Sequence, residues 1–163
     1  AHGFGMEVHA FDPYVSAEQT DELDCLMHDD VDSLFRACTH ISIHCNLSED
    51  THHLVNRERL AMMPDIGADG TACGSHIVNC ARGGIVDESA VLDALDSGVL
   101  SSAALDVFEV EPAIGNLLLQ HERFHGSPHI GAATLEAQNR VGTEMAGLLV
   151  AFFNGERPKS AIN

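Results

Sequence analysis

Short apolar runs alternate along the chain with stretches of helical periodicity, and turn residues separate them. Runs rich in β-branched and apolar residues predict strands, whereas apolar residues three and four positions apart predict helices. The predicted strands are 6–11, 39–45, 76–81 and 103–108, and the predicted helices are 17–27, 31–37, 56–63, 88–96 and 134–153. This alternation predicts a parallel sheet with right-handed crossovers.

Turn and capping signals mark the ends of several of these elements. Asp12-Pro13 stops the first strand, because proline has no amide hydrogen to donate to a ladder. Asn56 is a candidate N-cap, Gly98 stops the helix that precedes it, and Asn154-Gly155 supplies the C-cap of the last helix. The glycine-rich stretch 64–75 is predicted to be a loop.

The composition is that of a folded protein with one core. The chain has 163 residues, of which 45% are hydrophobic, and this is enough to bury one sizeable core. It contains neither an apolar run long enough to span a bilayer nor a charged-then-apolar signal segment. We therefore expect a cytoplasmic protein.

The charge is strongly acidic, with 25 acidic residues against eight basic ones and a formal net charge of −17. Such a field repels phosphates, so we expect neither a nucleic-acid nor a membrane partner. The acids are interleaved with apolar residues, and the single lysine is Lys159. This pattern favours a halophilic protein, in which counterions screen the self-repulsion. An ordinary acidic cytosolic protein is the alternative.

Cysteine and histidine are both present without metal-binding spacing. The five cysteines form no CxxC pair, and an intracellular chain of this size needs no disulfide framework. The eleven histidines form neither an HExxH motif nor a zinc-type spacing with cysteine. We interpret His52-His53 as a solvated loop pair, with a metal site as the alternative, and expect no metal.

The candidate chemistry lies where the predicted strands end. In an open α/β sheet, ligands bind at the carboxyl ends of the strands. Those ends are occupied by Asp12, His44-Cys45, Ala81-Arg82 and Asp106. We predict that they converge on one cleft.

Asp12 has the position of a nucleotide-binding acid. An acid at the tip of the second strand of a dinucleotide fold accepts hydrogen bonds from the adenosine ribose and disfavours a 2′-phosphate, which selects NAD over NADP. A simple Asp-Pro turn is the alternative. The glycine fingerprint expected about 20 residues earlier is not in this sequence.

The stretch NCARGGIVDE, residues 79–88, carries the most specific signal. An arginine at the carboxyl end of a strand can hold a carboxylate with two parallel hydrogen bonds, and the following glycines permit a sharp turn. Arg82 is thus a candidate substrate ligand. An ion pair with Asp87 is the structural alternative.

His129 is the candidate acid or base. It follows Pro128 and precedes a predicted helix, and histidine titrates near neutral pH. A carboxylate that hydrogen-bonds to it would fix its tautomer, and we assign that role to Glu111. A single histidine is more often structural, so this assignment depends on the wider pattern.

That wider pattern resembles the D-isomer-specific 2-hydroxyacid dehydrogenases. The motifs are a strand ending in Asp-Pro, NCARGGIVDE, AALDVFEVEP and SPHIGAAT, and the similarity covers nearly the whole chain. The resemblance implies an α/β fold, a Rossmann-type doubly wound parallel sheet. It also implies NAD as cofactor and hydride transfer between NAD and C2 of a D-2-hydroxy acid.

The resemblance assigns a role to each matching residue. Arg82 would bind the substrate carboxylate and the C2 oxygen, His129 would donate or accept the proton, and Glu111 would orient His129. Asp106 would lie on the nicotinamide side. The cofactor cleft would be lined by Cys80, Ala81, Ile130, Gly131 and Ala132, and His44 and Cys45 would lie near the adenosine half.

Residues 4–16, 134–138, 155–158 and 161–163 resemble family members that oxidise 3-phosphoglycerate in serine biosynthesis, although glyoxylate and hydroxypyruvate reductases share much of this text. The resemblance implies a small 2-hydroxy or 2-oxo acid as partner and a homodimer in the complete enzyme. A non-catalytic NAD-sensing corepressor and a truncated, inactive homologue remain as alternatives.

The sequence departs from the family pattern in three ways. Asn46 stands where the family usually has proline after the strand, which loosens the adenosine-side loop. The loop from Asp65 to Gly74 is longer than the family's tight turn, and we expect a surface excursion because loop length costs little free energy. The first strand, the glycine loop and the substrate domain have no counterpart. We therefore expect 1–163 to be a partial NAD-binding domain that binds NAD poorly by itself.

Overall fold

The computed structural model describes residues 1–15 and 24–158. The chain divides into two compact units, Ala1–Pro128 and His129–Asn163, and each is described by itself.

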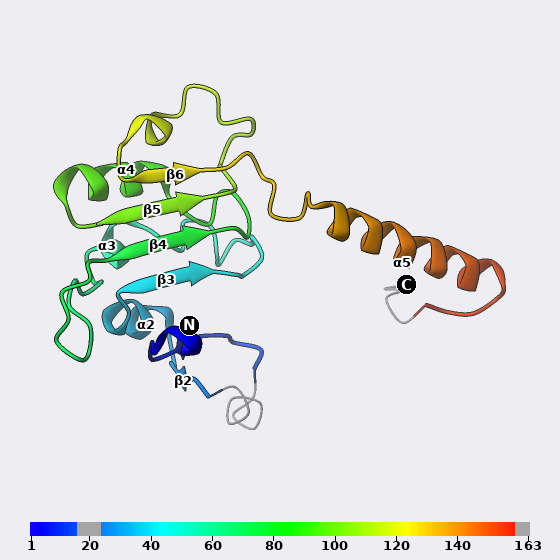
Figure 1. The fold of residues 1–163 in the computed structure, drawn as a ribbon, viewed down its shortest axis with the longest axis horizontal. Coiled ribbons are helices and arrows are strands. Elements are labelled where there is room, and N and C mark those ends of the chain that lie inside the picture. The colour runs from blue at the N-terminus through cyan, green and yellow to red at the C-terminus, as the bar shows by residue number, and fades with distance from the viewer. Residues whose placement is uncertain (16–23, 159–163) are drawn as a thin grey trace. The chain divides into compact units, whose positions relative to one another are not determined.

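The first unit contains two parallel sheets (Figure 1). The larger has the order β3-β4-β5-β6, and all its neighbouring strands run parallel. The smaller pairs β1 with β2, also in parallel. The strands are β1 (His9–Ala10), β2 (Leu26–Met27), β3 (His40–Ile43), β4 (His76–Asn79), β5 (Ser102–Leu105) and β6 (Phe124–Gly126).

The split into two sheets follows from the doubly wound strand order. In that order, 3-2-1-4-5-6, the first strand lies between the second and the fourth. If β1 and β2 take the second and third places, β3 takes the fourth, and the central place falls to no described residue. The predicted parallel α/β fold is therefore confirmed in its topology.

Several helical segments in the described part of the first unit accompany the sheets, and side-chain caps define where the α-helices start. Asp30, Asn56 and Asp87 accept hydrogen bonds from the amides of Ser33, Arg59 and Ala90, which satisfies amides that have no partner in the first helical turn. Gly98 ends α4 in the left-handed conformation (φ 78°). The helices are α2 (Val31–Ala37), α3 (Arg57–Leu60), α4 (Glu88–Ser97) and η2 (Leu117–Gln120), and a further turn, η1, spans His2–Phe4.

Most predicted elements are confirmed, with ends that differ by a few residues. The predicted helix 17–27 is wrong over its described part, because Leu26–Met27 forms β2. There the amides of Leu26 and His28 donate to the carbonyls of Val8 and Ala10 at 2.8 Å, so ladder pairing overrides the helical spacing. Residues 17–23 of that prediction lie outside the described residues.

Three further differences concern short elements. The strand predicted at 6–11 is reduced to two residues. The strand β6 and the single turn η2 were not predicted from periodicity. Both are only three or four residues long, which is too short for an apolar repeat to register.

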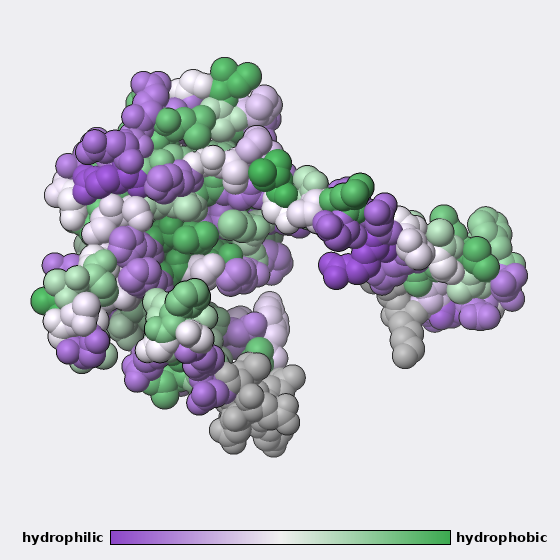
Figure 2. All heavy atoms as spheres, in the orientation of Figure 1, coloured by the Kyte–Doolittle hydropathy of each residue, from purple (hydrophilic) through white to green (hydrophobic). Residues whose placement is uncertain are grey.

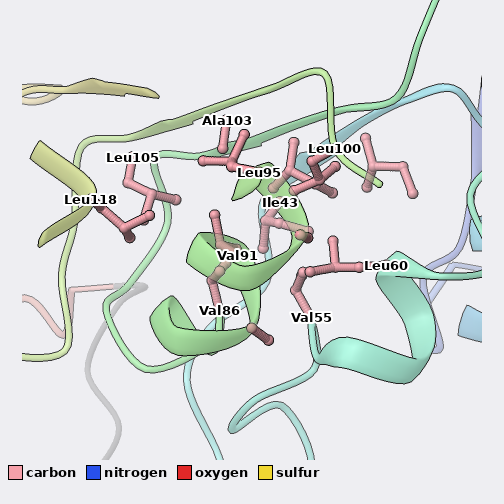
Figure 3. Packing of buried hydrophobic residues seen from close by; sticks show 14 of the residues in the cluster. Ile43, Val55, Leu60, Val86, Val91, Leu95, Leu100, Ala103, Leu105 and Leu118 are labelled. Carbon is pink, nitrogen blue, oxygen red and sulfur yellow. The ribbon is translucent and has the colours of Figure 1, made fainter. Parts of the chain in front are cut away.

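The core lies between one face of the larger sheet and α4 (Figure 3). Along β3, Ile41 and Ile43 are buried while Ser42 is exposed, as a two-residue period requires. Val91 and Leu95 of α4 are fully buried and face the sheet. Burying each such side chain stabilises the fold by about 1.5–3 kcal/mol, and this packing holds the strand ends that form the candidate site.

The long loop before β4 is a surface excursion, as predicted. Ile66 and Ala72 form an antiparallel bridge, and the Asp65 carbonyl accepts from the amides of Cys73 and Gly74 at 3.1 and 2.8 Å. The loop enters β4 at its amino end, so it lies at the sheet edge opposite the carboxyl ends of the strands.

The second unit consists mainly of α5 (Leu135–Phe153). Asn154 is its C-cap and Gly155 follows in the left-handed conformation (φ 84°), as the sequence predicted, and Thr134 caps its first turn. Side chains of both polarities cover α5 (Figure 2). Within the described ranges, no helix is both long enough and apolar enough to cross a membrane.

Candidate active site

The carboxyl ends of β4, β5 and β6 meet at one edge of the larger sheet. Asn79 pairs in register with Leu105, and Leu105 pairs with Gly126. The residues that follow, Cys80 to Arg82, Asp106 and Ser127, therefore emerge side by side. Two predicted site residues, Arg82 and Asp106, are thus brought to neighbouring strand ends within the first unit.

The side chain of Asn79 holds the backbone of the turn that carries Arg82. This side chain is buried (1% exposed), and its Nδ2 donates to the Arg82 carbonyl while its Oδ1 accepts from the Ala81 amide, both at 2.9 Å. Both backbone groups are therefore satisfied by one side chain. Such a doubly bonded clamp fixes the direction in which the chain leaves β4.

The guanidinium of Arg82 is exposed. Its Nη1 donates to the Ala81 carbonyl at 2.6 Å, and among the described residues no acidic side chain forms an ion pair with it. Asp87, the structural alternative as its partner, instead caps α4 through the Ala90 amide at 3.0 Å. The remaining donors of the guanidinium suit an anionic ligand such as a carboxylate.

Gly83 brings the Arg82 turn against the segment that follows β5. A Cβ placed on Gly83 would lie 1.8 Å from the Phe108 carbonyl oxygen. Only glycine allows the two backbones to approach this closely. The backbone of the turn after β4 is therefore packed directly against the backbone of the loop after β5.

Asp106 is a buried acid (5% exposed) at the end of β5. Its amide donates to the Asn79 carbonyl at 3.0 Å, which extends the β4-β5 ladder by one step. Its Oδ1 accepts from the Ser127 hydroxyl at 2.5 Å. A carboxylate of this kind is stabilised by short, charge-assisted bonds.

Glu111 is exposed in the loop after β5, where its Oε1 accepts from the Phe108 amide at 3.0 Å. Glu109 lies nearby in the same loop, and its Oε1 is 3.0 Å from Nε2 of His53. The Glu109 amide also donates to Glu88 at 2.6 Å. These bonds tie the loop to α4 and to the histidine pair.

His52 and His53 stack on each other, with ring centroids 4.0 Å apart. His53 is bound to Glu109, and in the described part of the chain no three histidine, cysteine or acidic side chains are grouped to hold a metal ion. All five cysteines have free thiols.

Asp12, predicted to bind the adenosine ribose, is exposed, and its Oδ1 accepts from the Tyr14 amide at 2.8 Å, as in a side-chain-closed turn. The adjacent Phe11 lines an open hollow of about 390 Å³, together with Asp29, Asp30, Val31, Asp32, Arg36 and Arg59. None of the predicted catalytic residues lines this hollow.

The remaining predicted cofactor residues of the first unit lie at strand ends. His44 is exposed, and its Nε2 is 2.8 Å from the Ser42 hydroxyl. Burial raises the pKa of the Cys45 thiol, which keeps it neutral and poorly nucleophilic. Cys80 is exposed and Ala81 is half-buried.

The second unit begins with the other predicted residues, all of which are exposed. His129 has a left-handed backbone (φ 54°), which is uncommon for a side-chain-bearing residue. The Ile130 carbonyl accepts from the Ala133 amide at 2.9 Å, Gly131 follows, and the Ala132 carbonyl accepts from the Gln138 side chain at 3.2 Å. The pairing of His129 with Glu111 stays a prediction.

Sequence reasoning missed three residues that build this site: Asn79, Gly83 and Ser127. The signal for Asn79 was an amide side chain at a strand end, three positions before the arginine. Gly83 was assigned only to the turn, and its close contact with Phe108 lies 25 positions away in sequence. Ser127 carried no separate signal.

Comparisons with known proteins give a consistent result. The family model described as "D-isomer specific 2-hydroxyacid dehydrogenase, NAD binding domain" matches residues 1–131. The chain is 37% identical over 163 residues to a D-3-phosphoglycerate dehydrogenase of Methanocaldococcus jannaschii, covering all of this chain and 30% of the relative. It is 43% identical over 148 residues to a hydroxypyruvate reductase of Thermotoga maritima, covering 89% of this chain and 44% of that protein.

Solved structures share the fold. A D-isomer specific 2-hydroxyacid dehydrogenase from a Polaromonas species superposes with a TM-score of 0.86 at 28% identity, covering 99% of this chain and 48% of the other. The D-mandelate dehydrogenase of Rhodotorula graminis, in its holo form, gives 0.81 at 30% identity, covering 93% and 42%. The chain thus spans less than half the length of each of these relatives.

Proposed function

Since this chain belongs to the D-isomer specific 2-hydroxyacid dehydrogenase family, as a match to the NAD-binding domain over residues 1–131 shows, we propose that the complete protein is an NAD-dependent oxidoreductase acting at C2 of a D-2-hydroxy acid. The observation that carries the proposal is the convergence of Arg82 and Asp106 at adjacent strand ends, with the guanidinium exposed and the acid buried.

Each residue has a distinct role in this reaction. Arg82 holds the substrate carboxylate and polarises the C2 oxygen. His129 takes the hydroxyl proton during oxidation and returns it during reduction, and Glu111 orients the imidazole. NAD, when bound, supplies the acceptor for the C2 hydride.

The proposal gives NAD two contact points among the described residues. The buried carboxylate of Asp106, beside exposed Cys80, suits the nicotinamide side. The carboxylate of Asp12 suits the ribose hydroxyls, because it lies on an exposed residue and can accept hydrogen bonds besides the one from the Tyr14 amide. The proposal also assigns His44, Cys45 and Ala81 of the first unit, and Ile130, Gly131 and Ala132 of the second, to cofactor binding.

Within the family, we propose 3-phosphoglycerate as the substrate and 3-phosphohydroxypyruvate as the product. Support comes from relatives described as D-3-phosphoglycerate dehydrogenases, which are 37% and 38% identical over the full chain but of which the chain spans 30% and 29%. A glyoxylate or hydroxypyruvate reductase is the second candidate, favoured by the 43% identity to a hydroxypyruvate reductase. A cytoplasmic homodimer remains part of the proposal.

The test is steady-state turnover by the complete protein with NAD and either D-3-phosphoglycerate or D-glycerate. We expect His129→Ala to lower kcat by about 10²- to 10⁴-fold, because the proton loses its positioned acceptor. Arg82→Ala should raise KM and lower kcat together. NAD binding without turnover of any 2-hydroxy acid would favour a non-catalytic NAD sensor, and absence of both would favour an inactive homologue.

A further inference from the structure

The strand ends of β5 and β6 place a hydroxyl against the buried acid of the site. Leu105 and Gly126 are register partners, so Asp106 and Ser127 are the next pair along the same ladder. The Ser127 amide donates to the Leu105 carbonyl at 3.0 Å, which holds the serine backbone in that ladder. Its hydroxyl then reaches Oδ1 of Asp106 at 2.5 Å.

This bond joins two residues whose backbones are already fixed. Asp106 is 5% exposed, and its backbone is fixed by the bond from its amide to the Asn79 carbonyl. A hydroxyl donor selects one orientation of the carboxylate and stabilises its ionised form. The backbone places the acid, and the serine hydroxyl orients the oxygens.

We propose that Ser127 is a positioning residue that holds the Asp106 carboxylate ionised and directed at the nicotinamide ring, and thereby favours the oxidised cofactor over the reduced one. This inference rests on the proposed function, which puts Asp106 on the nicotinamide side. The oxidised ring carries a positive charge and the reduced ring carries none. A fixed, buried carboxylate beside it therefore stabilises NAD⁺ more than NADH.

A purely structural role for Ser127 makes a different prediction. If its hydroxyl only supported the fold, its removal would weaken binding of both cofactor forms alike. If it orients the acid, its removal changes the ratio of the two dissociation constants. The ratio is therefore the informative quantity.

The test compares a matched pair of variants in the complete enzyme. Ser127→Thr keeps the hydroxyl, and Ser127→Val introduces a side chain of the same shape as threonine but without the hydroxyl. Ser127→Ala is a smaller replacement that introduces no crowding. The Kd of NAD⁺ is measured by calorimetry and that of NADH by its fluorescence, and circular dichroism checks the fold.

We expect the valine and alanine variants to bind NAD⁺ about tenfold more weakly, the scale of one hydrogen bond to a charged group. NADH binding should change by less than about threefold, and the threonine variant should bind both forms within about twofold of wild type. Equal behaviour of the threonine and valine variants, or an unchanged ratio of the two Kd values, would overturn the proposal. A wild-type enzyme that binds neither cofactor overturns the proposed function, and this role of Ser127 with it.

Discussion

Replacing Gly83 by alanine is the sharpest available perturbation of the candidate site. The new Cβ would lie 1.8 Å from the Phe108 carbonyl oxygen and 2.4 Å from its carbon, both backbone atoms. Real Cβ contacts essentially never fall below 3.0 Å, so the Arg82 turn and the loop after β5 must separate by roughly an ångström. The clash cannot be relieved by a side-chain rotation.

The displacement acts directly on the proposed chemistry. Arg82 precedes Gly83, and Asp106 and Glu111 lie on either side of Phe108 in the opposing loop. A misplacement of about 1 Å can cost about 10²-fold in rate, because reacting groups need near-ideal geometry. We therefore expect Gly83→Ala to lower kcat/KM of the complete enzyme about 100-fold.

The assay is steady-state reduction of NAD with the 2-hydroxy acid that the wild-type enzyme turns over. Gly98→Ala is the control, because Gly98 lies in the turn that ends α4 (φ 78°) and no atom lies within 4 Å of its added Cβ. The control should lose about 1 kcal/mol of stability with unchanged kcat/KM. A folded Gly83→Ala enzyme with kcat/KM within threefold of wild type, on the order of the scatter of such assays, would refute the reasoning.

Three further predictions concern stability. Leu95→Ala should lower the free energy of unfolding in urea by about 2–5 kcal/mol, whereas Val99→Ala, at an exposed position, should change it little. Desolvation and the stacked His76 lower the pKa of His40 from 6.5. The contribution of His40 to stability is therefore complete above pH 6.5 and is lost as the pH falls through the lower pKa of the folded state. In His40→Gln, the midpoint of urea unfolding should depend less on pH between about 7.5 and 5 than in the wild type. The protein has a net charge of −17, and salt screens the repulsion among its acids. The midpoint of urea unfolding should therefore rise between about 0.1 and 2 M KCl, and an unchanged midpoint would favour an ordinary acidic protein over a halophilic one.

The sequence by itself determined the class of fold and most elements of the larger sheet. The helix 31–37 was predicted with its exact bounds, and Asn56 and Gly98 mark helix ends as their chemistry requires. These features are local: capping and periodicity depend on residues within one helical turn. The motif around Arg82 was equally readable, because its residues are contiguous.

Only the tertiary structure decided how those motifs are held together. The close approach of Gly83 to Phe108 and the bond from Ser127 to Asp106 join segments that follow different strands. The parallel pairing of Leu26 with His9 likewise placed the end of a predicted helix in a strand. Such contacts depend on register between distant segments, and a local pattern of residue types contains no record of that register.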